Sequence, residues 1–474
     1  MEPLEEIADF VDKRGPTFTA LADAAWDYRV LRWQEFEPVE RQIALARDLG
    51  FRVGSNVGGV TSAFTAQAGQ GGPVLAFLGE HDALAGLSQT PGSATRGPEP
   101  AGESGCGREG GRHLRDPASL LAAATAEYLK TRQLPGRARY YGCPAEEAAA
   151  GLSFLVEEGA FSDVNVALSW QPGLFTATRQ ACTLACAQAY FSYQGTSLQA
   201  GGSPERGRSA LDAVELLNGG TNFLREYMSG DSRVRYVSAD AGTLPPNVVP
   251  MQASACYIVR ATTVADMLEL YDLVQTIAVG AALMTDTQLT VEVAGASAEF
   301  LPNETLEGVL HRNLNQLGGV PFDEDDQDTA ADFAATFGPS EAARDRAEAG
   351  VAAGHAAALH DDVPPPPAVL PRRRVALWTG VGDVSWVNPT VQLSVAVAAL
   401  GTPPHSWQLI AQGKLPAAHK GMLHAAKVIA GTAIDLVRDP VVLELATSEF
   451  REATATRPYR SPIPEGVVPP PART

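Results

Sequence analysis

An uninterrupted apolar run, VLAFL at residues 74–78, constrains the fold of this chain more than any other feature. A strand that is apolar at every position is typical of a sheet covered on both faces. Residues 118–130, ASLLAAATAEYLK, predict a helix after it, and residues 138–144, ARYYGCP, predict a second strand. Strand, helix and strand in this order indicate a mostly parallel sheet in an α/β fold.

The sequence pattern changes at about residue 181 and changes back at about residue 300. Between them the order is strand, helix, strand, strand, helix, strand, which predicts a ferredoxin-like α+β unit. We therefore expect residues 1–182 and 300–474 to form a larger domain in two parts, with residues 183–299 as a smaller domain inserted into it. The acidic, Ala-rich stretch from residue 323 to the prolines at 364–367 predicts a helical excursion with a solvated surface.

The net charge of −19 disfavours two classes of partner. Phosphate backbones and anionic lipids repel such a chain, so we expect no binding to nucleic acid or to membranes. The N-terminus lacks the basic and apolar regions of a signal peptide, and no run of about 18 apolar residues predicts a membrane span. The five cysteines, odd in number and without zinc-finger spacing, favour a reducing compartment, so we expect a cytoplasmic protein.

Two adjacent glutamates, Glu146 and Glu147, follow the predicted strand that ends at Pro144. Open α/β sheets form their ligand crevices at the carboxyl ends of strands. There, one carboxylate can bind a cation while its neighbour acts as general base on a metal-bound water. The structural alternative is that the pair only complements the dipole of the next helix. For His81, at the end of the apolar strand, a structural role is the simpler expectation.

Several stretches, in order over nearly the whole chain, resemble the M20 metallopeptidase and amidohydrolase family, in particular its aminobenzoyl-glutamate hydrolase B-subunit branch. They include FLGEHDALAGLSQ (77–89), YGCPAEEAAAG (141–151), SWQPG (169–173), GVGDVSW (380–386) and GTPPHSW (401–407). The resemblance implies a sheet-centred α/β catalytic domain and an inserted ferredoxin-like lid that forms a dimer. It also implies hydrolysis of the amide bond of an N-acyl amino acid, such as an N-acyl glutamate, by metal-activated water.

The resemblance also assigns roles to single residues. Glu146 matches the family's general base, and Glu147 and His405 match metal ligands. The family draws further ligands from a Cys-Gly-His motif, for which two alignments are open. One places the His on His113 and loses the Cys, and the other keeps Cys106 and loses the His. Either alignment removes a ligand.

Four further positions concern the substrate. At SWQPG the family's ligand His is replaced by Gln171, whose neutral amide is a poor ligand for a transition metal. We expect Gln171 to face the crevice and contact the substrate. In the lid, Gln199 replaces a His that stabilises the oxyanion in a partner subunit's site, and an amide can still donate a hydrogen bond. Asn247 and Arg260 match residues that hold a substrate carboxylate.

Two hypotheses about function follow. In the first, the chain is a divergent amidohydrolase of N-acyl amino acids, working with an atypical site that holds one divalent metal, zinc or manganese, or none. In the second, it is a catalytically inactive homologue that keeps the lid and acts as a binding or regulatory partner. The retained carboxylates and Arg260 favour the enzyme, whereas Gln171 and Gln199 favour the inactive homologue. We expect a homodimer through the lid.

Overall fold

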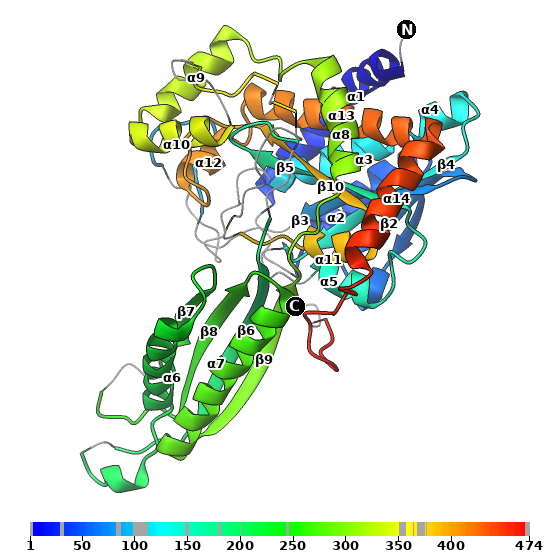
Figure 1. Cartoon of the computed structure of the whole chain (residues 1–474). Helices are drawn as coiled ribbons and strands as arrows, with labels where there is room; N and C mark the ends of the chain where they lie inside the picture. The colour runs from blue at the N-terminus through cyan, green and yellow to red at the C-terminus, as the bar shows by residue number, and fades with distance from the viewer. Residues whose placement is uncertain are drawn as a thin grey trace.

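The computed structural model describes most of the chain, in two bodies joined by a narrow waist (Figure 1). The described residues are 3–28, 33–81, 87–97, 112–146, 151–178, 182–199, 201–242, 246–349, 357–363, 365–366, 375 and 377–469. The larger body contains the first and the last described helices, and the smaller one is built from the middle of the sequence.

A six-stranded sheet forms the centre of the larger body. Its strands are β1 (Arg52–Ser55), β2 (Phe64–Gln70), β3 (Val74–His81), β4 (Gly136–Pro144), β5 (Val166–Gly173) and β10 (Thr390–Ala396). Their order is β1-β2-β4-β3-β5-β10. β3, β4, β5 and β10 run parallel, whereas β2 is antiparallel to both of its neighbours. The predicted mostly parallel α/β sheet is confirmed.

Helices cover both faces of this sheet. One face carries α1 (Pro3–Asp27), α3 (Arg112–Ala123) and α13 (Pro416–Arg438), and the other carries α5 (Gly151–Glu157) and α11 (Val381–Val387). Every residue of β3 is buried. Leu75 and Phe77 belong to the core on the α3 side, and Val74, Ala76 and Leu78 to the core on the α5 side, so the apolar run serves both layers.

The remaining helices surround these layers. They are α2 (Phe36–Asp48), α4 (Ala126–Thr131), α8 (Glu304–Leu317), α9 (Glu324–Ala334), α10 (Pro339–Ala349), α12 (Trp407–Gln412) and α14 (Pro440–Thr454). The excursion is helical as predicted, because α9 and α10 occupy it. It is not only a solvated surface: Phe333 is fully buried and packs with Leu359 and Ala411 in a small separate core.

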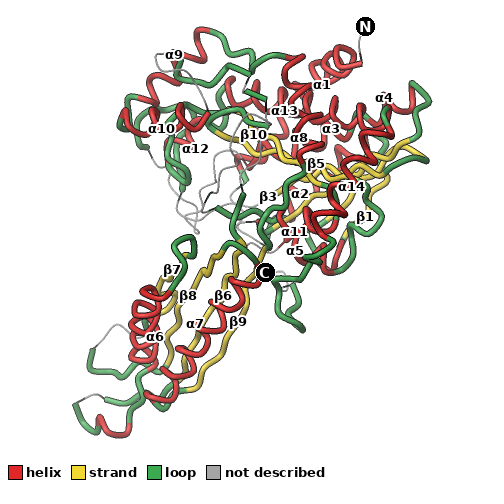
Figure 2. Tube along the Cα trace, in the orientation of Figure 1, coloured by secondary structure: helices red, strands yellow, loops and turns green. Residues whose placement is uncertain are grey.

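The smaller body, called the lid below, is a four-stranded antiparallel sheet with two helices on one face (Figure 2). Its elements are β6 (Ala185–Gln194), α6 (Ala210–Leu224), β7 (Arg233–Asp240), β8 (Gln252–Ala261), α7 (Val264–Thr285) and β9 (Gln288–Ser297). The strand order β7-β8-β6-β9, with this connectivity, confirms the ferredoxin-like unit.

Among the described helices, α7 has the length and the apolar composition that a membrane span would need. In the structure its residues Met267, Leu270, Val274 and Ala278 pack on the lid sheet. Only 33% of the most apolar 18-residue stretch of this helix is buried, so an apolar face of the helix is exposed.

Candidate active site

The carboxyl ends of β3 and β4 are where the main sheet is expected to bind a ligand, and this region is called the crevice below. These strands are parallel neighbours, with Glu80 opposite Cys143 and His81 opposite Pro144. The chain leaves β3 towards α3 on one face and leaves β4 towards α5 on the other. Open α/β sheets bind ligands where neighbouring strands diverge in this way.

Glu146 lies at this crevice, two residues beyond the end of β4, and only 2% of it is exposed. Its Oε1 accepts a hydrogen bond from the backbone N–H of Gly380, at the start of α11, at 2.8 Å. The preceding Ala145 has φ 56°, in the left-handed region that non-glycine residues rarely adopt. The carboxylate is therefore held in one orientation by a segment of the larger body that follows the lid in the sequence.

A buried network of polar side chains lies beneath the carboxyl ends of β3 and β4. The carboxylate of Glu80 forms a bidentate ion pair with Arg115 of α3, with Nη2 to Oε1 at 2.6 Å, and both side chains are at most 1% exposed. Next to it, Asp116 accepts hydrogen bonds from Gln42 at 2.8 Å and from Tyr140 at 3.0 Å. Burial and the neighbouring Asp116 raise the pKa of Tyr140 well above its usual value, so its hydroxyl stays protonated.

His81 belongs to the same network, since its Nδ1 lies 3.2 Å from Asp116 Oδ2. This contact agrees with the structural role expected for it. Sequence reasoning did not single out Glu80, Arg115 and Asp116. The available signal was the adjacent charged pair Arg115–Asp116 before a nearly apolar helical stretch, ASLLAA at residues 118–123.

The lid reaches the crevice at the end of its sheet that joins the catalytic domain. There Cys186 of β6 lies opposite Arg260 of β8. Burial raises the pKa of the Cys186 thiol to about 12, Arg260 lowers it through its charge and a hydrogen bond, and the charge of Glu146 raises it. The backbone N–H of Leu184, just before β6, donates to the carbonyl of Leu377 at 2.8 Å, so this end of the lid sheet lies next to the segment whose Gly380 holds Glu146.

Gln171 lies near the carboxyl end of β5, opposite Ser394 of β10, and is partly exposed. Its neighbour Trp170 is fully buried on the α3 side, where its indole N–H donates to the carbonyl of Arg115 at 3.2 Å. Strand alternation therefore turns Gln171 to the other face, the one on which α5 lies.

The predicted histidine ligands occupy different surroundings. His113 is buried, and its Nε2 lies 2.8 Å from the carbonyl oxygen of Gly413, just beyond α12. His405 is exposed, has φ 52°, and directly precedes Ser406, which caps α12. Cys106 and Glu147 lie outside the described residues.

No metal site is assembled from the described part of the chain. Within it, no group of three or more His, Cys, Asp or Glu side chains is arranged to hold a metal ion. The ligand set of Glu147, His405 and His113 or Cys106 thus stays a prediction.

Gln199 and Asn247 lie together at the opposite end of the lid. Gln199 pairs with Val248 in an isolated bridge, and both Gln199 and Asn247 are exposed. They adjoin the ends of β6 and β8 that point away from the catalytic domain. A strand of ten residues separates this end from the crevice, about 30 Å at the usual rise. Within one chain, therefore, they do not join Glu146 and Arg260.

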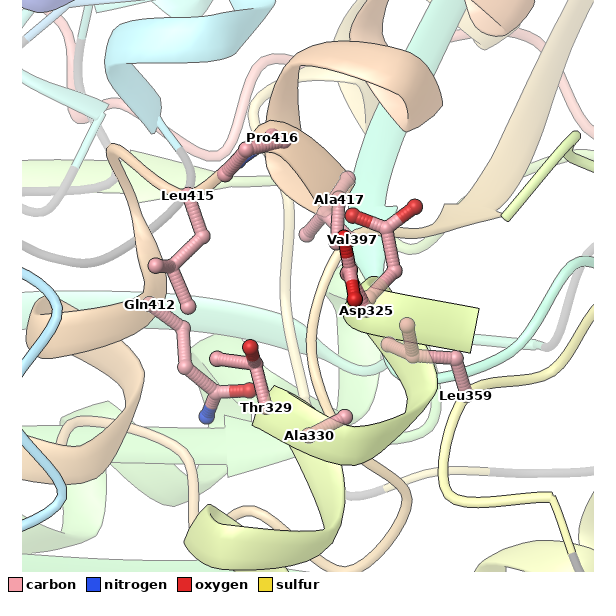
Figure 3. Close-up of a pocket in the computed structure, with 10 residues that line it drawn as sticks. Asp325, Thr329, Ala330, Leu359, Val397, Gln412, Leu415, Pro416 and Ala417 are labelled. Carbon is pink, nitrogen blue, oxygen red and sulfur yellow. The ribbon is translucent and has the colours of Figure 1, made fainter. Parts of the chain in front are cut away.

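A separate small pocket lies between α9, α12 and the start of α13 (Figure 3). Its walls include Thr329, Leu359, Gln412 and Leu415, and it contains none of the predicted site residues. The amide of Gln412 serves the fold here, because its Oε1 accepts from the backbone N–H of Ala399 at 2.9 Å. The pocket marks where the excursion docks on the catalytic domain.

Comparison with known proteins finds a relative that matches over the full length of the chain. No family model matches the chain. The chain is 39% identical to the B subunit of p-aminobenzoyl-glutamate hydrolase from Escherichia coli over 476 aligned residues, which cover 98% of each chain.

Solved structures share the fold at lower identity. An aminobenzoyl-glutamate utilization protein from Klebsiella pneumoniae matches with a TM-score of 0.58 and 16% identity, over 90% of this chain and 97% of the other. A dinuclear metal-binding peptidase of the M20 family from Bacillus subtilis matches with a TM-score of 0.51 and 15% identity, over 90% and 99%. Both matches extend over the catalytic domain and the lid.

Proposed function

Because the chain belongs to the M20 metallopeptidase and amidohydrolase family, in the aminobenzoyl-glutamate hydrolase B-subunit branch, we propose that it hydrolyses the amide bond of N-acyl glutamates. As a family member it is a hydrolase of C–N bonds. The observation that carries the finer proposal is the buried carboxylate of Glu146, held by the segment that pairs with the Arg260 end of the lid.

The proposed chemistry needs a base and an anchor. Glu146 takes a proton from the attacking water, the water oxygen bonds to the amide carbon, and the proton passes to the nitrogen as the C–N bond breaks. The hydrogen bond that Glu146 Oε1 accepts from Gly380 N–H holds the carboxylate in place for this task. Arg260 holds the carboxylate of the amino-acid portion, because its planar fork matches a carboxylate with two hydrogen bonds.

We also propose that the metal site is atypical, with one zinc or manganese ion or none. The related M20 peptidase is named as dinuclear, whereas Gln171 here brings an amide where the family has a histidine. No catalytic step is assigned to a metal. Elemental analysis of purified protein, before and after incubation with zinc or manganese, tests this, and two metals per chain would contradict it.

A dimer through the lid is the third part of the proposal. Exposed apolar side chains gather on the outer sides of the two lid helices, at Leu216, Phe223, Leu273 and Leu283. Burying them against a second copy removes apolar area from water. The distal position of Gln199 and Asn247 supports the same arrangement, since the crevice of a second copy is one they can reach. The Escherichia coli relative is named as one subunit of its hydrolase, which makes a different partner chain the competing outcome.

The direct test is release of glutamate from p-aminobenzoyl-glutamate by the purified chain, without added metal and with zinc or manganese. The proposal predicts that the chain releases glutamate without a different partner chain. Light scattering on the same sample distinguishes a homodimer from a monomer that awaits a different partner chain. A well-folded chain that binds the substrate but releases no glutamate under any of these conditions would favour the inactive homologue.

A further inference from the structure

The carboxylate of Glu35 is buried in the larger body, and the proposed chemistry does not use it. Glu35 directly precedes α2, and none of it is exposed to solvent. A residue at this N-cap position often caps the first turn of its helix, but the Glu35 side chain accepts no such hydrogen bond. The side chain turns instead towards the residue that follows β4.

Glu35 accepts hydrogen bonds from segments that are far apart in the sequence. Its Oε1 accepts from the backbone N–H of Trp33 at 2.9 Å and from that of Ala145 at 3.1 Å. Its Oε2 accepts from the hydroxyl of Ser62 at 3.2 Å. One oxygen thus joins the chain before α2 to the residue directly before Glu146, 110 positions after Glu35.

Both residues that donate to this oxygen have an unfavourable backbone conformation. Trp33 has φ 67° and Ala145 has φ 56°, in the left-handed region, where the Cβ of an L-residue lies too close to a carbonyl oxygen. Such conformations persist only where the surrounding contacts hold them. Ala145 is fully buried and Trp33 is 6% exposed, so water does not replace Oε1 as the acceptor. The shared oxygen is therefore one of the contacts that keep Ala145 left-handed.

The conformation of Ala145 decides where the next side chain points. Rotation of φ at Ala145 into the common negative range would turn the chain that follows and carry Glu146 away from the N–H of Gly380, now at 2.8 Å. The segment that carries Glu35 is itself anchored beside this turn. The ring of Trp33 packs edge-on against Phe154 of α5, with ring centres 6.2 Å apart. Glu35 is thus placed to fix the direction of Glu146.

We propose that Glu35 is a positioning residue for the catalytic base: it holds Ala145 in the left-handed conformation and so aims the carboxylate of Glu146 at the substrate amide. The inference rests on the proposed function, because it takes Glu146 as the base. Because the donors at Trp33 and Ala145 are neutral N–H groups, the role requires an acceptor oxygen at the right distance rather than a negative charge.

Two substitutions separate distance from charge. Glu35→Asp keeps the carboxylate but shortens the side chain by one methylene, about 1.5 Å, so that an oxygen no longer reaches both N–H groups. Glu35→Gln is the matched control, since it keeps the length and an acceptor oxygen and removes the charge. Melting curves establish that both variants fold. Crystal structures then report φ of Ala145, and hydrolysis of p-aminobenzoyl-glutamate reports kcat and KM.

In Glu35→Asp we expect Ala145 to leave the left-handed region and kcat to fall by about 10- to 100-fold, with KM within about 2-fold. Glu35→Gln should keep φ of Ala145 and a kcat within about 3-fold of wild type. In the Glu146→Gln background, Glu35→Asp should change the residual kcat by less than about 2-fold, because a positioning residue acts only through the group that it positions.

Three results would overturn the inference: a left-handed Ala145 in Glu35→Asp, an unchanged kcat in that variant when the wild type is active, or an equal loss in Glu35→Gln. A loss from Glu35→Asp that is as large in the Glu146→Gln background would do the same. If Glu35→Asp does not fold, Glu35→Gln decides, since a loss of kcat or of the left-handed Ala145 contradicts the role of the acceptor oxygen. A wild-type chain that hydrolyses nothing, with Ala145 displaced in Glu35→Asp, leaves the positioning standing and overturns the proposed function.

Discussion

Glu146 depends on neighbours that are distant in the sequence. Its hydrogen-bond donor, Gly380, comes more than 200 residues later, and the left-handed Ala145 before it donates its backbone N–H to Oε1 of Glu35 at 3.1 Å. A non-glycine residue in this conformation costs about 1 kcal/mol, which the surrounding contacts offset. The position of the carboxylate is therefore set by several segments at once.

Gly380→Ala tests this positioning. A Cβ at residue 380 would lie 2.4 Å from Glu146 Oε2 and 3.2 Å from Leu152, so the carboxylate must move. Because a displacement of about 1 Å can cost about 100-fold in rate, we expect kcat to fall by about 10- to 100-fold with a smaller change in KM. Gly308→Ala, in α8 with nothing within 4 Å of its Cβ, is the control and should keep full activity. Equal kcat for both variants would contradict the positioning.

The sequence predicts some site residues and not others for a physical reason. Glu146 is recognisable because two acidic residues follow a strand and a proline, a local pattern, and because the family motif contains it. The buried pair of Glu80 and Arg115 joins residues 35 positions apart, and its burial depends on helices α1 and α13 that cover α3. No local pattern contains that information.

At the scale of elements, the excursion has more contacts than its acidic composition predicts. Asp345 of α10 is 4% exposed, and its Oδ2 accepts from the backbone N–H of Gly401 at 2.8 Å. Burial raises the pKa of this carboxyl. Gly401 begins the loop that carries His405, so this hydrogen bond from α10 stabilises a loop of the predicted site.

Asp345→Ala removes the acceptor and leaves the buried N–H of Gly401 without it, at a cost of about 1–3 kcal/mol. We expect a lower melting temperature and faster proteolysis in residues 400–406. Asp345→Asn keeps an acceptor oxygen and should restore most of the loss. If the alanine and asparagine variants are equally destabilised, the hydrogen bond is not the cause.

The strand pattern was the most predictable part of the fold. The run VLAFL identified a strand covered on both faces, because each face needs its own apolar residues. The ferredoxin-like lid followed from the order of its elements. The docking of α9 and α10 did not follow, since an Ala-rich helix with acidic residues resembles a solvated helix until its buried face is known.

At the scale of the whole molecule, Asp383 joins the catalytic domain, the lid and the C-terminal segment. It is fully buried and accepts hydrogen bonds from Ser153 of α5 at 2.7 Å, from the N–H of Ala298 after β9 at 3.1 Å, and from the hydroxyl of Tyr459 at 2.8 Å. Burial raises the pKa of Asp383 to about 6, although these hydrogen bonds lower it. The junction therefore contains a carboxyl that titrates near neutral pH.

The stability of the folded chain should therefore depend on pH through Asp383. The folded chain binds a proton at Asp383 below about pH 6, and the unfolded chain only below about pH 4, so this group's contribution to stability is full below pH 4 and falls as the pH rises to 6. Over this pH range the contribution of Asp383 to the free energy of unfolding falls by about 3 kcal/mol. Asp383→Asn should therefore raise the melting temperature relative to wild type more at pH 7 than at pH 4.5. A difference that is the same at both pH values would contradict this titration.

The central claim, that Glu146 is the base of an amidohydrolase of N-acyl glutamates, is tested most directly by steady-state hydrolysis of p-aminobenzoyl-glutamate by the wild-type chain and by Glu146→Gln. The amide can keep the hydrogen bond from Gly380 but cannot take a proton, so kcat should fall by about 100- to 10,000-fold while substrate binding and metal content stay within about 2-fold. Unchanged kcat in Glu146→Gln, in a preparation whose wild type hydrolyses the substrate, would contradict the claim.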